Sequence, residues 1–188
     1  PTGRCIQKPY DPDQGFDDYY NESYHRYFNG EMKNKDSILV ADSLKYITEG
    51  GKVVYGGGGI IPDIYVPLTD YPELAYYNSL IRQGMIFRYA FEYTDAHRNE
   101  LNRFEDFEDF NKHFNVAPVL FEELLDFAAS HGLKKDKASA DYARQKIKTL
   151  LKAYIARNLY DNEGFYPLYL SMDEVYLKAL KLLQEPAS

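Results

Sequence analysis

Histidine and cysteine are the first side chains to consider, because they supply most metal ligands and many catalytic bases. The chain has four histidines and a single cysteine, Cys5. No two histidines are three or four residues apart and no His-Glu-x-x-His sequence occurs, so a zinc site would need ligands from distant parts of the chain. A structural role is therefore the preferred interpretation for each histidine: His25, His97, His113 and His131.

The serines and carboxylates also lack the spacing of a catalytic site. No serine lies in the Gly-x-Ser-x-Gly sequence of a nucleophile elbow. A Ser-His-Asp triad assembled from distant residues stays open, since its members need not be neighbours in sequence. Three serines have polar neighbours, and a fourth has the spacing of a helix cap: Ser23, Ser37, Ser43 and Ser171. The acidic pairs are expected on exposed helix faces: Asp17-Asp18, Glu105-Asp106 and Glu108-Asp109.

Carboxylates spaced like those of a calcium-binding loop run from Asp11 to Glu22. The sixth position of such a loop needs glycine for its sharp turn, and here it is Phe16. Pro9 also prevents a helix from entering the loop. We therefore expect a solvated helix start, and we predict that the chain contains no catalytic residue, no metal site and no cofactor site.

Glycine is densest at Gly56–Gly59, directly after a β-branched and aromatic run at 52–55 that favours a strand. With a second short strand at 44–48 and a glycine turn between the two, the pattern predicts a hairpin. A phosphate-binding loop would need a helix N-terminus after the glycines, and Ile60-Ile61-Pro62 cannot start one. A last short strand is expected at 64–66.

Two segments of the chain resemble conserved sequences of the C-terminal processing serine peptidases. The first family sequence reads Gly-Arg-x-Val-Tyr/Phe-x-Gly-Gly-Gly-Ile-x-Pro-Asp, and Lys52 replaces its usual arginine. It is matched by Gly51, Val53, Tyr55, Gly57, Gly58, Gly59, Ile60, Pro62 and Asp63. The second reads Thr-Pro-Ser/Thr-Gly-Arg-x-Ile-Gln and is matched by Pro1, Thr2, Gly3, Arg4, Ile6 and Gln7. The helical tail is similar more loosely, at Ala156-Arg157-Asn158 and Asp173-Glu174-Val175.

The resemblance implies that the chain is one part of a longer protein and that the catalytic residues lie in another part. In that family the catalytic residues are a serine nucleophile and a lysine base, and both lie on a ClpP/crotonase-like α/β core. Both residues, and a peptide-binding PDZ domain, precede the Thr-Pro-Ser/Thr-Gly-Arg sequence. Residues 1–70 would then be the C-terminal end of the peptidase core, and residues 71–188 a helical domain that supports the core or mediates self-association. The resemblance also implies a bacterial cell-envelope location, periplasmic or membrane-anchored through a preceding segment.

Composition argues against several other classes of function. The chain of 188 residues carries a net charge of −7 and no basic stripe, so binding to nucleic acid or anionic lipid is not expected. No apolar run is long enough to span a bilayer. Tyrosine is abundant, with 19 residues, and we expect most of these rings on half-buried helix faces because they are apolar with a polar tip.

The remaining pattern predicts a mainly α chain with a small β portion. Aromatic residues at helical spacing predict a helix at 13–29, inserted between the two family sequences. From Pro72 onward almost everything favours helix, with breaks expected at Gly84 and at the turn 161–164. For the last helix we expect a capping box of Ser171 and Glu174. Its buried stripe is expected to be Val175, Ala179, Leu182 and Leu183.

The leading hypothesis is the non-catalytic C-terminal portion of a serine endopeptidase that processes protein C-termini. Its partners would be the upstream peptidase core and PDZ domain, and a second copy of the chain. In that case segments 1–10 and 56–67 are expected to pair with each other, to pair across a dimer or to lack order. The alternative is a stand-alone helical module that binds a protein or peptide through tyrosine-rich faces. A small independent hydrolase is the third hypothesis, and it would need the distant triad.

Overall fold

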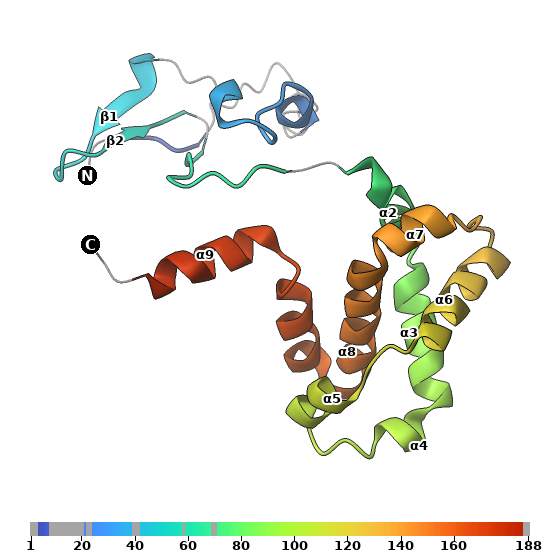
Figure 1. Cartoon of the computed structure of the whole chain (residues 1–188). Coiled ribbons are helices and arrows are strands. Elements are labelled where there is room, and N and C mark those ends of the chain that lie inside the picture. Colours follow the sequence, from blue (N-terminus) through green and yellow to red (C-terminus); the bar gives the residue numbers. More distant parts are fainter. Residues whose placement is uncertain are drawn as a thin grey trace. The chain divides into compact units, whose positions relative to one another are not determined.

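The computed structural model describes residues 4–7, 21, 24–38, 42–57, 59–68 and 71–185. The chain divides into two compact units, Pro1–Thr69 and Asp70–Ser188. Figure 1 shows the small β portion in the first unit and the helices of the second.

The first unit contains the predicted hairpin. Strand β1, Lys45–Ile47, pairs antiparallel with β2, Val53–Tyr55, with Tyr46 opposite Val54. The turn closes through a bond from the Thr48 amide to the Lys52 carbonyl at 2.9 Å. Gly51 has a φ of 78°, a conformation that glycine adopts without steric cost. Among the described residues before the hairpin, 3₁₀ turns lie at Lys35–Ser37 (η2) and Asp42–Leu44 (η3).

The rest of the first unit differs from the predicted pattern. Residues 24–28 of the insert are helical, and most of the predicted helix 13–29 lies outside the described residues. The strand expected at 64–66 is absent: the segment has no regular structure, and its bonds go to a turn instead. The Tyr65 hydroxyl donates to the Glu31 carbonyl at 2.6 Å, and the Leu68 amide donates to the Met32 carbonyl at 2.7 Å. Pro62 and Pro67 have no N–H to donate, so a ladder at 64–66 could not be extended past either end.

The second unit begins with a proline-led turn. Helix η4, Pro72–Leu74, leads into α2, Ala75–Arg82, and Gly84 then turns the chain into α3, Met85–Ala96. Gly84 has a φ of 67°, so the break predicted there is confirmed. The next helices are α4, Arg98–Leu101; α5, Phe107–His113; α6, Pro118–Ser130; and α7, Lys137–Tyr142.

The longest element, α8, covers Arg144–Leu170 and bends sharply in the middle. Tyr160 and Asp161 have non-helical backbone angles, so α8 consists of a first arm, 144–159, and a second arm, 162–170. Gly164 of the second arm lies directly against Ala156 of the first. The turn that the sequence predicts at 161–164 is therefore a bend centred two residues earlier, at Tyr160–Asp161.

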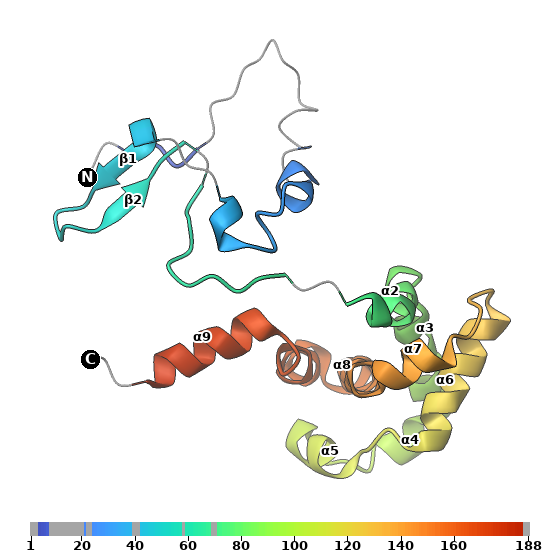
Figure 2. The ribbon, with the colours of Figure 1, turned by 45° about the horizontal axis from the view of Figure 1, so that its top comes forward.

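The hydrophobic core forms where α3 and the first arm of α8 lie side by side, with α2, α5 and α6 around them (Figures 1 and 2). Apolar residues recur at helical spacing on each of these helices, which is the pattern that buries one face. The largest fully buried side chains include Leu80, Ile86, Phe110, Phe121, Leu124, Leu125, Ile147, Leu151 and Ile155. Helical spacing predicts five inward residues for the long helix: Ala143, Ile147, Leu150 and Leu151 are buried, and Tyr154 is half-buried against the core.

Helix α9, Glu174–Gln184, differs from the prediction in its cap and in its burial. Its cap is Asp173, whose carboxylate accepts from the amides of Val175 and Tyr176, both at 2.9 Å. Ser171 instead donates to the Leu168 carbonyl at 2.7 Å. No residue of α9 is buried, and Leu183 is 85% exposed. The amphipathic pattern is present, but nothing in the described part of the second unit buries its apolar side.

Helices dominate the described residues, and their β-structure is the single antiparallel pair, so the chain is mainly α with a small β portion, as predicted. None of the helices in the described part of the chain is long and apolar enough to cross a membrane.

Candidate functional site

The two family-like segments, about fifty residues apart in the sequence, contact each other in the first unit. The Gly57 amide donates to the Cys5 carbonyl, and the Gly59 amide donates to the Ile6 carbonyl, both at 2.8 Å. The Arg4 guanidinium donates to the Tyr55 carbonyl at 3.3 Å. The segment 4–7 therefore lies beside the end of β2 and the glycines that follow it. Main-chain hydrogen bonds from Gly57 and Gly59 hold it there. We refer to this contact as the motif junction.

Close approach explains why glycines stand at the motif junction. A side-chain carbon at Gly56 would lie 2.9 Å from the Cys5 carbonyl oxygen and 3.2 Å from Cγ of Arg4. At Gly57 the same carbon would lie 2.9 Å from a methyl group of Leu44. Separations under 3.0 Å are almost never tolerated, so a side chain at Gly56 would push the 4–7 segment away. The glycines here serve chain packing, and no helix N-terminus follows them to bind phosphate.

An ion pair links the two ends of the glycine-containing sequence. Lys52 Nζ lies 2.7 Å from a carboxylate oxygen of Asp63, and both side chains are exposed. Lys52 is the position where the resembled family usually has arginine, and Asp63 is its final aspartate. The replacement keeps the charge but replaces a planar guanidinium with a single ammonium. An exposed pair of this kind contributes at most about 1 kcal/mol.

The first unit leaves apolar side chains uncovered around the motif junction. Ile60 is 71% exposed, and Ile47 is 65% exposed. The other exposed apolar residues nearby in sequence are Ile6, Val53, Ile64 and Leu68. Of the three arrangements expected for segments 1–10 and 56–67, the described residues show the first, because the two segments pair with each other.

The histidines of the second unit share one structural role. His97 and His131 are the C-cap residues of α3 and α6, and His113 is the last residue of α5. Each has Nδ1 within 2.9–3.1 Å of the carbonyl oxygen four residues earlier. A helix C-terminus has unpaired carbonyls and a partial negative charge, so a ring N–H there is favourable. These bonds give each of the three rings a local structural role at a helix end.

No catalytic triad is formed among the residues that the structure describes. The Ser130 hydroxyl lies 3.2 Å from His131 Nδ1, but both groups also lie within bonding distance of the Phe127 carbonyl oxygen. His113 Nδ1 lies 2.7 Å from the Asp109 carboxylate, and both belong to one exposed turn of α5. A bond from the Glu105 amide and then the one from His113 hold the pKa of Asp109 below its usual value. This pair therefore belongs to the local bonding of α5.

The acidic pairs of α5 have local roles. Asp106 caps α5 by accepting from the Asp109 amide at 2.8 Å, and Glu105 and Glu108 are exposed. Asp17 and Asp18 lie outside the described residues, as do Asp11 and Ser23. Across the described ranges no group of three His, Cys, Asp or Glu side chains could hold a metal ion.

One basic residue that the sequence did not single out is Lys152 on α8. Its Nζ donates to the Asn111 carbonyl at 2.6 Å and lies 5.8 Å from the centre of the Phe110 ring. Partial burial lowers the pKa of Lys152. Because this ammonium bonds a main-chain carbonyl near the end of α5, it joins α5 to α8. No pattern in the sequence marks it, because Asn111 and Lys152 are far apart along the chain.

Comparison with known proteins gives one match. Residues 76–161 match the model of a family described as "Family of unknown function (DUF8443)", which covers slightly less than half of the chain. This segment begins in α2 and ends at the bend of α8. Searches of the curated proteins and of the solved structures found no match. The helical core of the second unit is therefore similar to a family whose function is not known.

Proposed function

We propose that this chain is the non-catalytic C-terminal portion of a C-terminal processing serine peptidase. One observation carries the proposal: the two sequences on which the resemblance depends are in contact at the motif junction. Chance similarity in two separate segments gives no reason for them to meet. Two conserved parts of one core are expected to do so, because each preserves the other's backbone bonds.

The exposed apolar side chains of the first unit agree with this assignment. If the first unit were a complete domain, it would leave Ile60, Ile64 and Val53 exposed to water. In a peptidase core, neighbouring strands would cover these side chains. Re-burial of such groups favours association by about 25 cal/mol per Å² of apolar area. The proposed partners are therefore the upstream core and PDZ domain, in a cell-envelope location. The helical unit would support that core or join two copies.

The intact gene and its product test the proposal. An upstream serine, followed by a lysine, is expected in the same reading frame; a start codon directly before Pro1 would contradict it. In the full-length product, Gly56→Ala should lower hydrolysis of an unstructured peptide at least about tenfold, because the methyl group meets the Cys5 carbonyl. Gly50→Ala is the matched control, since its nearest contact is 4.0 Å away.

The 188-residue chain alone should not hydrolyse such a peptide. Turnover that disappears when one of its own serines is replaced would contradict the proposal and support the independent-hydrolase hypothesis.

A second candidate is a protein- or peptide-binding module. It is favoured by the aromatic side chains that the second unit leaves exposed, namely Phe87, Phe91, Tyr142, Tyr166 and Tyr169. A native start codon before Pro1 would favour this candidate over the first.

A further inference from the structure

The bend in α8 is a small interruption of an otherwise continuous helix. Only Tyr160, with φ −130° and ψ 17°, and Asp161, with φ 53° and ψ −139°, depart from helical geometry over 144–170. A change in the backbone angles of these two residues would therefore join the two arms into one helix. The joined helix would gain backbone bonds across the bend, where amide and carbonyl groups four residues apart would pair.

Asp161 is strained in the bent form. Among the described residues it is the only one other than glycine with a positive φ. Its combination of positive φ and extended ψ belongs to turn positions that glycine normally occupies. A straight α8 places Asp161 in the ordinary helical region, so straightening releases this strain.

The contacts between the arms do not depend on the arms belonging to one molecule. The Tyr154 and Phe165 rings lie 5.2 Å apart, and the Arg157 guanidinium lies 5.4 Å from the Phe165 ring. Gly164 fits against the backbone of Ala156. A second copy of the chain presents the same first arm, so its surface accepts the second arm with every one of these contacts intact.

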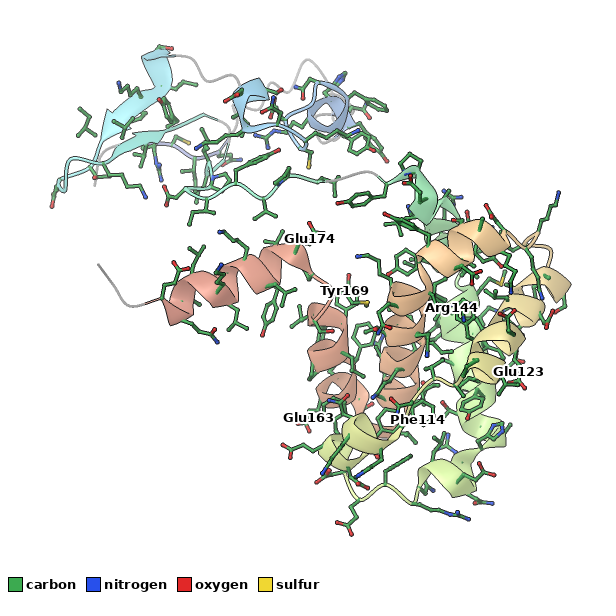
Figure 3. The ribbon with its side chains drawn as sticks, viewed as in Figure 1. Phe114, Glu123, Arg144, Glu163, Tyr169 and Glu174 are labelled. Atoms are coloured by element: carbon green, nitrogen blue, oxygen red, sulfur yellow. The ribbon has the colours of Figure 1, made fainter. Side chains whose placement is uncertain are left out.

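The second arm is also lightly attached. Gly164 is its only buried residue, and Phe165 and Leu168 are partly buried against the core. Figure 3 shows Glu163 at the start of this arm and Tyr169 near its end, followed by Glu174 at the start of α9. The apolar side of α9, exposed in the single chain, would travel with the arm and meet the second copy.

We propose that the Tyr160–Asp161 bend is an exchange hinge: α8 straightens, and residues 162–185 of each copy pack on the first arm of the other, which gives an arm-exchanged dimer. The second copy is the partner that the structure itself specifies, because it already contains the surface complementary to the arm. Short, strained hinges between packed elements favour such exchange. The proposal does not depend on the peptidase assignment.

Variants at the hinge give opposite predictions. Asp161→Gly removes the strain of the bent form and should lower the dimer fraction. Asp161→Ala raises that strain and favours helix, so it should raise the dimer fraction. Each dimer contains two hinges, so a change of about fivefold per hinge becomes roughly 25-fold in the dimerisation constant. Glu163→Ala, on the exposed face of the same arm, is the matched control and should behave like the parent chain.

The measurement is size-exclusion chromatography with light scattering on the 188-residue chain, refolded at high concentration and then diluted. Gly164→Ala provides a further check, because the clash with Ala156 occurs in both the bent and the exchanged forms. Gly164→Ala should therefore leave the dimer fraction unchanged or lower. If any loosening of the contact between the arms were enough to cause dimerisation, Gly164→Ala would raise the dimer fraction. Because Asp161→Gly is expected to fold at least as well as the parent, its result stands even if another variant fails to fold.

Cross-linking identifies which copy each arm contacts. In a Cys5→Ser background, a chain carrying only Tyr154→Cys is refolded with a chain carrying only Phe165→Cys. Oxidation should yield a covalent heterodimer if arms exchange, since these rings are neighbours across the arm contact. Monomers in the parent and in Asp161→Ala at every concentration, or a dimer whose amount is equal in the two Asp161 variants, would overturn the proposal. A dimer that forms no such disulfide would also overturn it.

Discussion

Gly164 lies against the backbone of Ala156, and adding one methyl group there should lower the free energy of unfolding. The new carbon would lie 2.5 Å from the Ala156 carbonyl oxygen, and ordinary contact begins at 3.4 Å. The arms must therefore separate by roughly 0.9 Å, a distance set by the closest packed approach of atoms. Because the obstacle is backbone and not a flexible side chain, a rotamer change cannot relieve it.

The expected size of the effect combines three contributions. Overpacking of a close contact costs about 1–3 kcal/mol. Alanine in a helix regains about 1 kcal/mol relative to glycine, and the unfolded chain loses some entropy in the same direction. Separation of the arms also loosens Phe165 and Leu168, which pack on the core. We expect Gly164→Ala to be destabilising by roughly 1–2 kcal/mol net.

Urea unfolding followed by circular dichroism, at a concentration where the chain is monomeric, measures this difference. Glu163→Ala is the neighbouring control and should change the free energy of unfolding by no more than about 0.5 kcal/mol, because its side chain is exposed. If Gly164→Ala were as stable as Glu163→Ala at unchanged urea dependence, the close packing of the two arms would be refuted.

Three further predictions concern the second unit. Ser139→Ala should destabilise it by about 1–3 kcal/mol in urea unfolding, because the buried hydroxyl donates to the Glu73 carbonyl at 2.5 Å and accepts from the Tyr76 amide at 3.2 Å; the exposed Ser130→Ala should have little effect. Asp173→Ala should reduce helicity of α9 by removing its cap, a loss of about 1 kcal/mol, whereas Ser171→Ala should not; a loss in Ser171→Ala and none in Asp173→Ala would favour the capping box of Ser171 and Glu174. Burial raises the pKa of Tyr77 to about 12 from its usual value of 10, so the unfolded chain deprotonates first. The contribution of Tyr77 to stability should therefore be constant below about pH 10 and be lost as pH rises from about 10 to about 12, at less than about 1.4 kcal/mol per pH unit because the ring is partly exposed; the fall in stability over this range should be weaker in Tyr77→Phe than in the parent chain, and an identical fall in both would contradict the assignment.

Local patterns in the sequence predict the elements that depend on local physics. The hairpin arises from β-branched residues on either side of Gly50-Gly51, and the start of α6 is set by Pro118. Burial of Ile147 and Leu151 is predicted by their helical spacing. At the motif junction, sequence similarity indicated the two segments, but only the structure shows that they meet.

Prediction fails where distant contacts decide the outcome. The stripe on α9 has the spacing of a buried face, yet spacing specifies that a face could be buried and not that a partner exists. Asp173 and Ser171 both have capping side chains, and the local path of the chain selects Asp173. In the sequence, Gly164 is compatible both with a turn and with a helix that packs closely against another helix, so its residue type does not decide between the two.

The family match and the burial pattern divide the second unit at the same place. Every residue of the buried core cluster lies between Tyr76 and Ala156, and the matched segment is 76–161. The matched segment therefore contains the buried core of the unit, whereas the second arm has one buried residue, Gly164, and α9 has none. A segment that buries its own core can keep its fold when the helices after it change, because little of its stability depends on those helices. The bend at Tyr160–Asp161 thus separates the helices that form the buried core from the arm that packs on it, which is where an exchange between copies would disturb that core least.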